Sequence, residues 1–91
     1  MDDWRLRSKI AEIAGSPKNL RFQELETLLE NHFRERYPNF DHRQRGSHHV
    51  FTVGNQTIVL VEPSSGCVKR YIVEKFLEAM EELGWYEREE E

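Results

Sequence analysis

Three short segments with strand character follow one another between residues 40 and 62, and this succession constrains the fold most. Residues 40–45 are polar and give the weakest signal, whereas residues 47–53 end in a Val-Phe-Thr-Val run that favours extended backbone. Residues 54–56, Gly-Asn-Gln, indicate a turn. The run "TIVLVE" (residues 57–62) is the strongest strand signal. Its continuous apolar character predicts a central, well-covered strand.

Segments with helical periodicity lie on both sides of these strands. A first helix is predicted over residues 3–14, a second between residues 19 and 40, and a third between residues 69 and 85. Pro38 disfavours helical geometry at the preceding residue, so the second helix should end before Tyr37. Gly84 suits the end of the third helix. The expected apolar faces are Trp4, Ile10, Ile13 and Ala14; then Phe22, Leu25, Leu28, Leu29 and Phe33; then Ile72, Phe76, Ala79, Met80 and Leu83.

The order of elements, α-α-β-β-β-α, predicts an α+β fold. A three-stranded antiparallel sheet would carry the helices on one face, because each element buries its apolar side against another layer. The second face of the sheet would be left for solvent or for a binding partner. A chain of 91 residues is expected to form a single domain (1–91) with a modest core.

Composition narrows the class of protein. The net charge is −4, so the chain is not a polycation that coats nucleic acid, and binding of an anion would need a local patch. No apolar run reaches the roughly 20 residues that span a bilayer. The charged N-terminus is unlike a secretory signal, and a single cysteine, Cys67, predicts a reduced, cytoplasmic setting without membrane association. The candidate basic residues for a local patch are Arg34, Arg36, Arg43, Arg45, Lys69 and Arg70.

The stretch "RGSHH" (residues 45–49) is the main candidate site. Adjacent strand residues point to opposite faces, so His48 and His49 are not expected to share a metal ion. His42 could lie near one of them across a hairpin, but no carboxylate or second thiol sits at ligand spacing, so no metal site is predicted. Ser47 beside His48 is not a catalytic pair, because a base must reach the nucleophile and be oriented by a third group.

Acid–base chemistry remains open to these histidines. Cleavage of RNA through its 2′-hydroxyl needs a proton-transfer group near neutral pH and cations that neutralise phosphate. Arg43, Arg45 and Gly46 stand directly before His48, and a glycine allows an RNA backbone to approach. The alternative is that both histidines are ordinary polar residues at a sheet edge. Periodicity does not decide which of the two faces outward.

Three stretches together resemble the HicA-type toxins, the mRNA-cleaving half of HicA/HicB toxin–antitoxin pairs. They are "NLRFQELETLLE" (residues 19–30), "RGSHHVF" (45–51) and "GCVKRYIVEKFLEAMEELGW" (66–85). The resemblance assigns residues 20–85 to a HicA-like core, with an extra N-terminal helix at 3–14 and an acidic tail at 86–91. It implies a double-stranded-RNA-binding-like fold, α-β-β-β-α, and the activity of a ribosome-independent endoribonuclease active in stress responses.

The resemblance also implies site residues and partners. The catalytic group would be His48, facing outward, with His49 inward or sideways. Gly46 matches the family glycine, Arg45 stands where a lysine is usual, and Lys69 matches the basic residue that enters the last helix. With Arg43, these residues would bind the mRNA substrate; no cofactor and no metal are implied, and a HicB-like antitoxin would inhibit the enzyme.

One departure from the family pattern leaves alternatives open. The segment before the GSHH motif is about five residues longer than usual, which could alter RNA specificity or mark a member that binds without cutting. A non-catalytic RNA-binding module and a protein-interaction domain on the same fold are therefore the competing functions.

Overall fold

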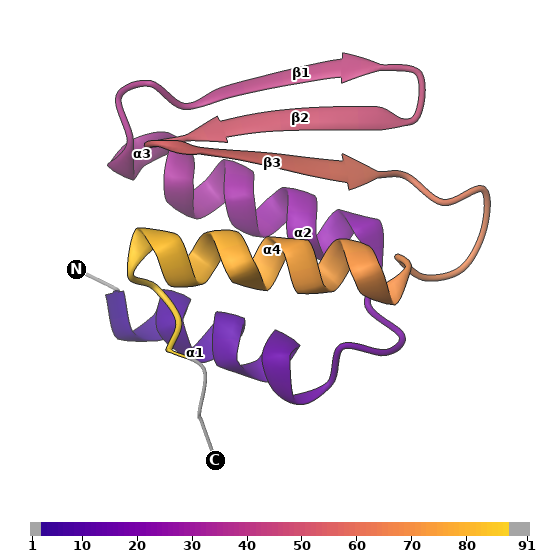
Figure 1. Cartoon of the computed structure of the whole chain (residues 1–91), viewed down its shortest axis with the longest axis horizontal. Helices are drawn as coiled ribbons and strands as arrows, with labels where there is room; N and C mark the ends of the chain where they lie inside the picture. Colours follow the sequence, from indigo (N-terminus) through magenta and orange to yellow (C-terminus); the bar gives the residue numbers. More distant parts are fainter. Residues whose placement is uncertain (1–2, 88–91) are drawn as a thin grey trace.

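A computed structural model describes residues 3–87 of the chain. A three-stranded sheet forms one layer, α2 and α4 lie side by side beneath it, and α1 lies on the far side of these two helices (Figure 1). The elements are α1 (Asp3–Gly15), α2 (Phe22–Leu28), the π-helical segment η1 (Leu29–Phe33), α3 (Arg34–Arg36), β1 (Asp41–Arg45), β2 (His48–Val53), β3 (Gln56–Val61) and α4 (Arg70–Leu83).

The sheet is an antiparallel meander in the order β1-β2-β3. Each connection has two residues and starts with a glycine in the left-handed region, Gly46 with φ of 61° and Gly54 with φ of 59°. Glycine adopts such angles without a steric penalty, and tight turns of this kind pair consecutive strands. The predicted central position of the third strand is therefore wrong: β2 lies in the centre, and β3 is an edge strand whose Val59 is 41% exposed.

The helical boundaries follow the expected signals. Residues 22–36 are helical without interruption, and Tyr37 before Pro38 is extended, with φ of −122° and ψ of 112°. Gly84 ends α4 in the left-handed conformation, with φ of 86°. In α1 the buried face differs from the predicted one, because Leu6 is fully buried while Trp4 is 66% exposed. A helix turns by about 100° per residue, so burying Ile10 and Ile13 brings Leu6 rather than Trp4 onto the same face.

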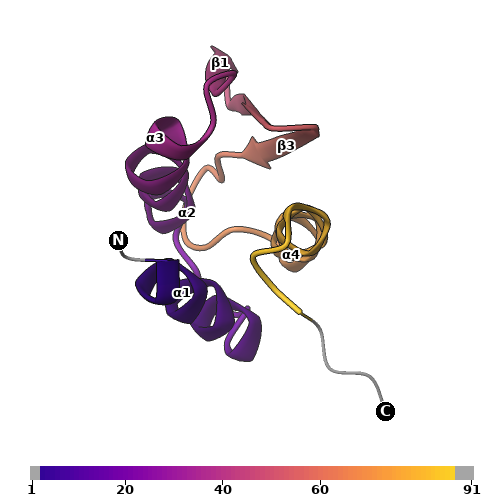
Figure 2. The same cartoon turned by 90° about the vertical axis from the view of Figure 1, so that its left-hand side faces the viewer.

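All helices lie on one face of the sheet, with α2 on the β1 side and α4 on the β3 side (Figure 2). The core lies between these layers, and its largest fully buried side chains are Phe33, Phe51 and Phe76. The predicted α+β fold class is confirmed, and residues 20–85 have the α-β-β-β-α arrangement of double-stranded-RNA-binding-like domains. Of the predicted acidic tail, residues 88–91 lie outside the described residues.

Within residues 3–87, no helix combines the length and the apolar character needed to cross a membrane. The outer face of the sheet, which turns away from α2 and α4, is not covered by any described element (Figure 2). The residues of β2 alternate between this face and the buried one: His48 and Val50 are exposed, whereas His49, Phe51 and Val53 are buried. The histidine stretch thus lies where the uncovered face meets the first turn of the sheet.

Candidate functional site

His48 is the first residue of β2, and its side chain is on the outer face of the sheet. Its register partners are Arg45 on β1 and Val61 on β3. Directly opposed residues of an antiparallel pair share a face, so Arg45 and His48 are neighbours on the exposed side. The orientation implied by the family resemblance, with His48 outward and His49 inward, is the one observed.

Gly46 and Arg43 flank this pair. Gly46 opens the two-residue turn between Arg45 and His48, and nothing lies within 4 Å of the position that a Cβ would take there. Arg43, two residues before Arg45, has the same outward orientation, and its Nε lies 3.0 Å from Asp41 Oδ2. That ion pair is exposed and worth little, so the Arg43 side chain can exchange it for another anion.

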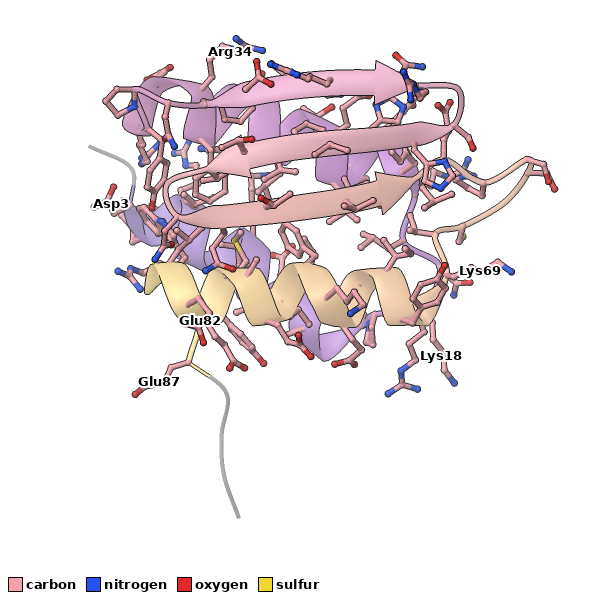
Figure 3. The ribbon with its side chains drawn as sticks, turned by 45° about the horizontal axis from the view of Figure 1, so that its top comes forward. Asp3, Lys18, Arg34, Lys69, Glu82 and Glu87 are labelled. Carbon is pink, nitrogen blue, oxygen red and sulfur yellow. The ribbon has the colours of Figure 1, made fainter. Side chains whose placement is uncertain are left out.

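Lys69 does not lie on the sheet but belongs to the same end of the molecule. It precedes α4 directly as the N-cap residue, with extended backbone. The start of α4 and the β1–β2 turn lie at the same end, and Lys69 points outward there (Figures 1 and 3). The sheet register thus brings Arg43, Arg45, Gly46 and His48 together. Lys69 lies at the same end of the molecule but is not part of the sheet.

Arg34 and Arg36, two of the other predicted basic residues, have partners elsewhere. Arg34 lies 2.6 Å from Glu30 Oε1 along the helix. Arg36 lies 3.1 Å from Asp3 Oδ1 and also donates to the backbone carbonyl of His32. These two arginines therefore tie the helical layer together and do not extend the patch around His48.

On the inner face, a second histidine joins His49. His42 of β1 lies beside it, with His42 Nε2 2.9 Å from His49 Nδ1. His42 Nδ1 lies 2.7 Å from Glu30 Oε2, and His49 Nε2 lies 3.1 Å from Glu62 Oε1. The result is a continuous chain of side-chain contacts, Glu30–His42–His49–Glu62, running from η1 through β1 and β2 to the residue after β3.

The expectation that no carboxylate would accompany the histidines is wrong. Among the described residues, Glu26, His42 and His49 each place a ligand atom within 4.8 Å of the others. Sequence spacing missed Glu26 and Glu30 because they are far from the histidines along the chain. A signal was present: both glutamates continue the stripe of Phe22 at spacings of four and eight, which directs them toward the sheet.

The pKa of Glu30 is shifted from its ordinary value. Burial raises the pKa of Glu30, but hydrogen bonds from His42 and Arg34, together with the positive charge of Arg34, outweigh that effect. The pKa of Glu30 therefore lies below its ordinary value. The carboxyl group of Glu30 therefore ionises more readily in the folded protein than in the unfolded chain.

Glu30→Gln should make the free energy of unfolding less sensitive to acid. Because the folded pKa of Glu30 is depressed, its contribution is full above the unfolded pKa and disappears as the pH falls through the folded pKa. Urea unfolding between about pH 7 and pH 3 should give a smaller loss of stability for the variant than for wild type. Glu35→Gln, which removes an exposed carboxylate of α3, controls for the change in net charge. Equal pH slopes for wild type and Glu30→Gln would contradict the assignment.

Comparison with models of protein families, with curated proteins and with solved structures gave no match. The fold class therefore rests on the arrangement of the strands and helices themselves. The function must be argued from the chemistry of the outer face.

Proposed function

We propose that the protein is a HicA-like endoribonuclease that cleaves mRNA without the ribosome, with His48 as its catalytic residue. The observation that carries the proposal is the pairing of an exposed histidine with Arg45 across the β1–β2 turn. His42 and His49 face the helices, so neither shares the outer face with His48. A single-histidine mechanism is therefore the one that suits this surface.

In the proposed reaction His48 acts as a general base on the 2′-hydroxyl. The 2′ oxygen attacks the adjacent phosphorus while the bond from phosphorus to the 5′ oxygen breaks. The departing 5′ oxygen receives a proton from His48 or from water, leaving a 2′,3′-cyclic phosphate and a 5′-hydroxyl end. Arg45 and Arg43 would neutralise the charge that builds on the phosphate oxygens, and Gly46 would leave room for the backbone.

The distribution of charge supports an anionic substrate at this end despite the net charge of −4. Lys18 and Lys69 project from the end where β2 starts, whereas Asp3, Glu82 and Glu87 lie toward the opposite end, and Arg34 also lies away from the two lysines (Figure 3). Electrostatic attraction would thus orient an RNA strand with its phosphates toward the β1–β2 turn. This local asymmetry replaces the overall positive charge that typical nucleic-acid-binding domains carry.

The outer face also supports an inhibitory protein partner, a HicB-like antitoxin. Val50 and Val59 are direct register partners in the middle of this face and are 36% and 41% exposed. They stand next to Arg43, so the surface combines an apolar centre with cationic neighbours. An antitoxin with a matching apolar and acidic surface would cover His48 together with the two valines.

Incubation of purified protein with ribosome-free mRNA tests the proposal. We expect cleavage products with 5′-hydroxyl ends, formed equally with and without added Mg²⁺. Tight, salt-sensitive binding of the RNA without any products would instead favour the non-catalytic RNA-binding module. Absence of both cleavage and RNA binding would favour the protein-interaction domain.

Arg45→Gln should weaken RNA binding and reduce its salt dependence. Each phosphate contact that is lost lowers the slope of log affinity against log salt concentration by about 0.7 to 0.9. Arg45→Gln and its control are made in a His48→Ala background, so that binding is measured without cleavage. Arg5→Gln removes the same charge from exposed α1 and is the matched control. The same slope for Arg45→Gln and Arg5→Gln would remove Arg45 from the proposed substrate site.

A further inference from the structure

The two histidines of the inner face have no role in the proposed cleavage, and their geometry points to a different ligand. His42, His49 and Glu26 of α2 form a group that we call the histidine cluster. The cluster lies between the edge strand β1, the central strand β2 and α2, on the opposite side of the sheet from His48. It thus offers a separate site within the same small domain.

Counting hydrogens in the chain Glu30–His42–His49–Glu62 shows why the cluster needs a cation. His42 Nδ1 and His49 Nε2 each face a carboxylate oxygen, at 2.7 and 3.1 Å, and an ionised carboxylate only accepts hydrogen bonds. Two neutral imidazoles carry two N–H groups for three contacts, and when both carboxylates are ionised the two N–H groups point to the carboxylates. His42 Nε2 and His49 Nδ1 then direct lone pairs at each other across 2.9 Å. A positive charge between the two nitrogens turns this repulsion into attraction.

We propose that the histidine cluster binds a divalent transition-metal ion of the zinc type. The ligands would be His42 Nε2, His49 Nδ1 and a carboxylate oxygen of Glu26, and water would complete the coordination. Two histidines and one glutamate form a known donor set for zinc with one open position. Tetrahedral zinc with bonds of about 2.0 to 2.1 Å holds its nitrogens about 3.3 Å apart. The observed N···N distance of 2.9 Å therefore needs to widen by a few tenths of an ångström, and the Glu26 oxygen, which lies within 4.8 Å of both nitrogens, needs to move closer to them.

The outer partners of the two histidines strengthen the assignment. Metal-binding histidines usually donate their second ring N–H to a carboxylate, which fixes the tautomer and makes the ligand nitrogen more basic. Glu30 and Glu62 occupy these two positions, one for each ring. The cluster therefore has both the ligands and the supporting carboxylates of a metal site, contributed by the continuous helix of residues 22–36, by β1, by β2 and by the residue after β3.

The surroundings suit an ion that fastens the sheet to α2. The ring of Phe51 stacks on His42 at a centroid distance of 4.0 Å, and that of Phe22 lies 4.6 Å from His49. These rings hold the imidazoles in place, while the His42 side chain is still 15% exposed at the edge of the sheet. An ion bound here would connect β1 and β2 to the helix that carries Glu26.

A proton is the competing occupant of the same gap. The charged and titratable groups that face it are Glu26 and Glu30 from the helical layer, Glu62 after β3, and Arg34 beyond Glu30. Metal and proton compete for the same nitrogen lone pairs, so the apparent affinity for zinc should fall as the pH decreases. The proposal is decided by which of the two cations the cluster prefers near neutral pH.

Calorimetric titration of metal-free protein with Zn²⁺ tests the proposal. We expect one equivalent to bind, with an affinity that decreases by at least about tenfold in Glu26→Gln and further in His42→Gln. Co²⁺ in place of Zn²⁺ should give the visible absorption of a tetrahedral ion. The half-exposed Glu62 provides a variant, Glu62→Gln, that leaves the core intact and should weaken binding by about 10- to 100-fold.

His48→Gln is the control that separates this site from the proposed nuclease. It removes an exposed histidine from the other face and should leave the affinity for zinc unchanged while RNA cleavage is lost. Zinc uptake that is absent in wild type, or equal in wild type, Glu26→Gln and Glu62→Gln, would mean that the cluster holds only a proton. Because no RNA is used, that result would not bear on the proposed cleavage.

Discussion

His48→Ala should lower the rate of RNA cleavage by about 10²- to 10⁴-fold, the contribution expected of a positioned acid–base group. The side chain is exposed on the uncovered face of the sheet, so its removal should leave the fold unchanged. Single-turnover cleavage of a defined mRNA measures the effect, and circular dichroism of both proteins confirms that they are folded. A matching loss of growth arrest on expression in bacteria is expected.

Thr57→Ala is the control for this experiment. Thr57 is exposed on the same face but lies near the other end of the sheet, opposite Thr52. We expect its cleavage rate to stay close to that of wild type. A His48→Ala protein that cuts RNA and arrests growth as well as wild type would end the proposal of a histidine-dependent nuclease.

Phe51→Ala should destabilise the protein by about 3 to 5 kcal/mol. Phe51 is fully buried in the central strand, and its ring contacts His42 and Phe40. Its removal loses apolar burial and leaves a cavity that the neighbouring layers fill only in part. A domain of this size has a total stability of about 5 to 15 kcal/mol, so a large fraction of the variant could be unfolded at 37 °C. Urea unfolding followed by circular dichroism measures the difference.

Val50→Ala, the adjacent substitution, should cost about 1 kcal/mol or less. Val50 points to the outer face and is 36% exposed, so little burial is lost. The contrast between two neighbouring positions tests the assignment of the two faces directly. Similar losses for Phe51→Ala and Val50→Ala would show that the outer face is covered in solution.

The sequence predicts the extent and the buried face of the second helix well because its signals are local. The stripe from Phe22 to Phe33 and the stop before Pro38 follow from spacing and from backbone sterics alone. The apolar run in β3 was misleading, because its alternate residues differ in burial and both kinds are aliphatic. In β3 the alternation of buried and exposed residues comes from the geometry of the sheet and is not accompanied by a change of residue type.

The histidine cluster shows what sequence alone does not supply. His42 and His49 become neighbours through the β1–β2 register, in which His42 pairs with Phe51 and His49 with Gln44. Glu26 and Glu30 reach them only because α2 packs under the β1 side of the sheet. Such a meeting of four segments depends on tertiary packing, which no spacing rule contains. The proposed role of His48 follows from a family resemblance, and periodicity left the choice between the two histidines open.

The length of the two-residue turn at Gly46 and Ser47 limits how this sequence can change during evolution. Strand side chains alternate with a period of two, so a change of one residue in the register would exchange the faces of His48 and His49. The exposed histidine would become the buried one, and both proposed sites would be lost together. Descendants of this sequence can thus vary Ser47 more freely than the length of the turn or Gly46, which has a φ of 61°. Insertions between β1 and β2 should be rare among functional relatives.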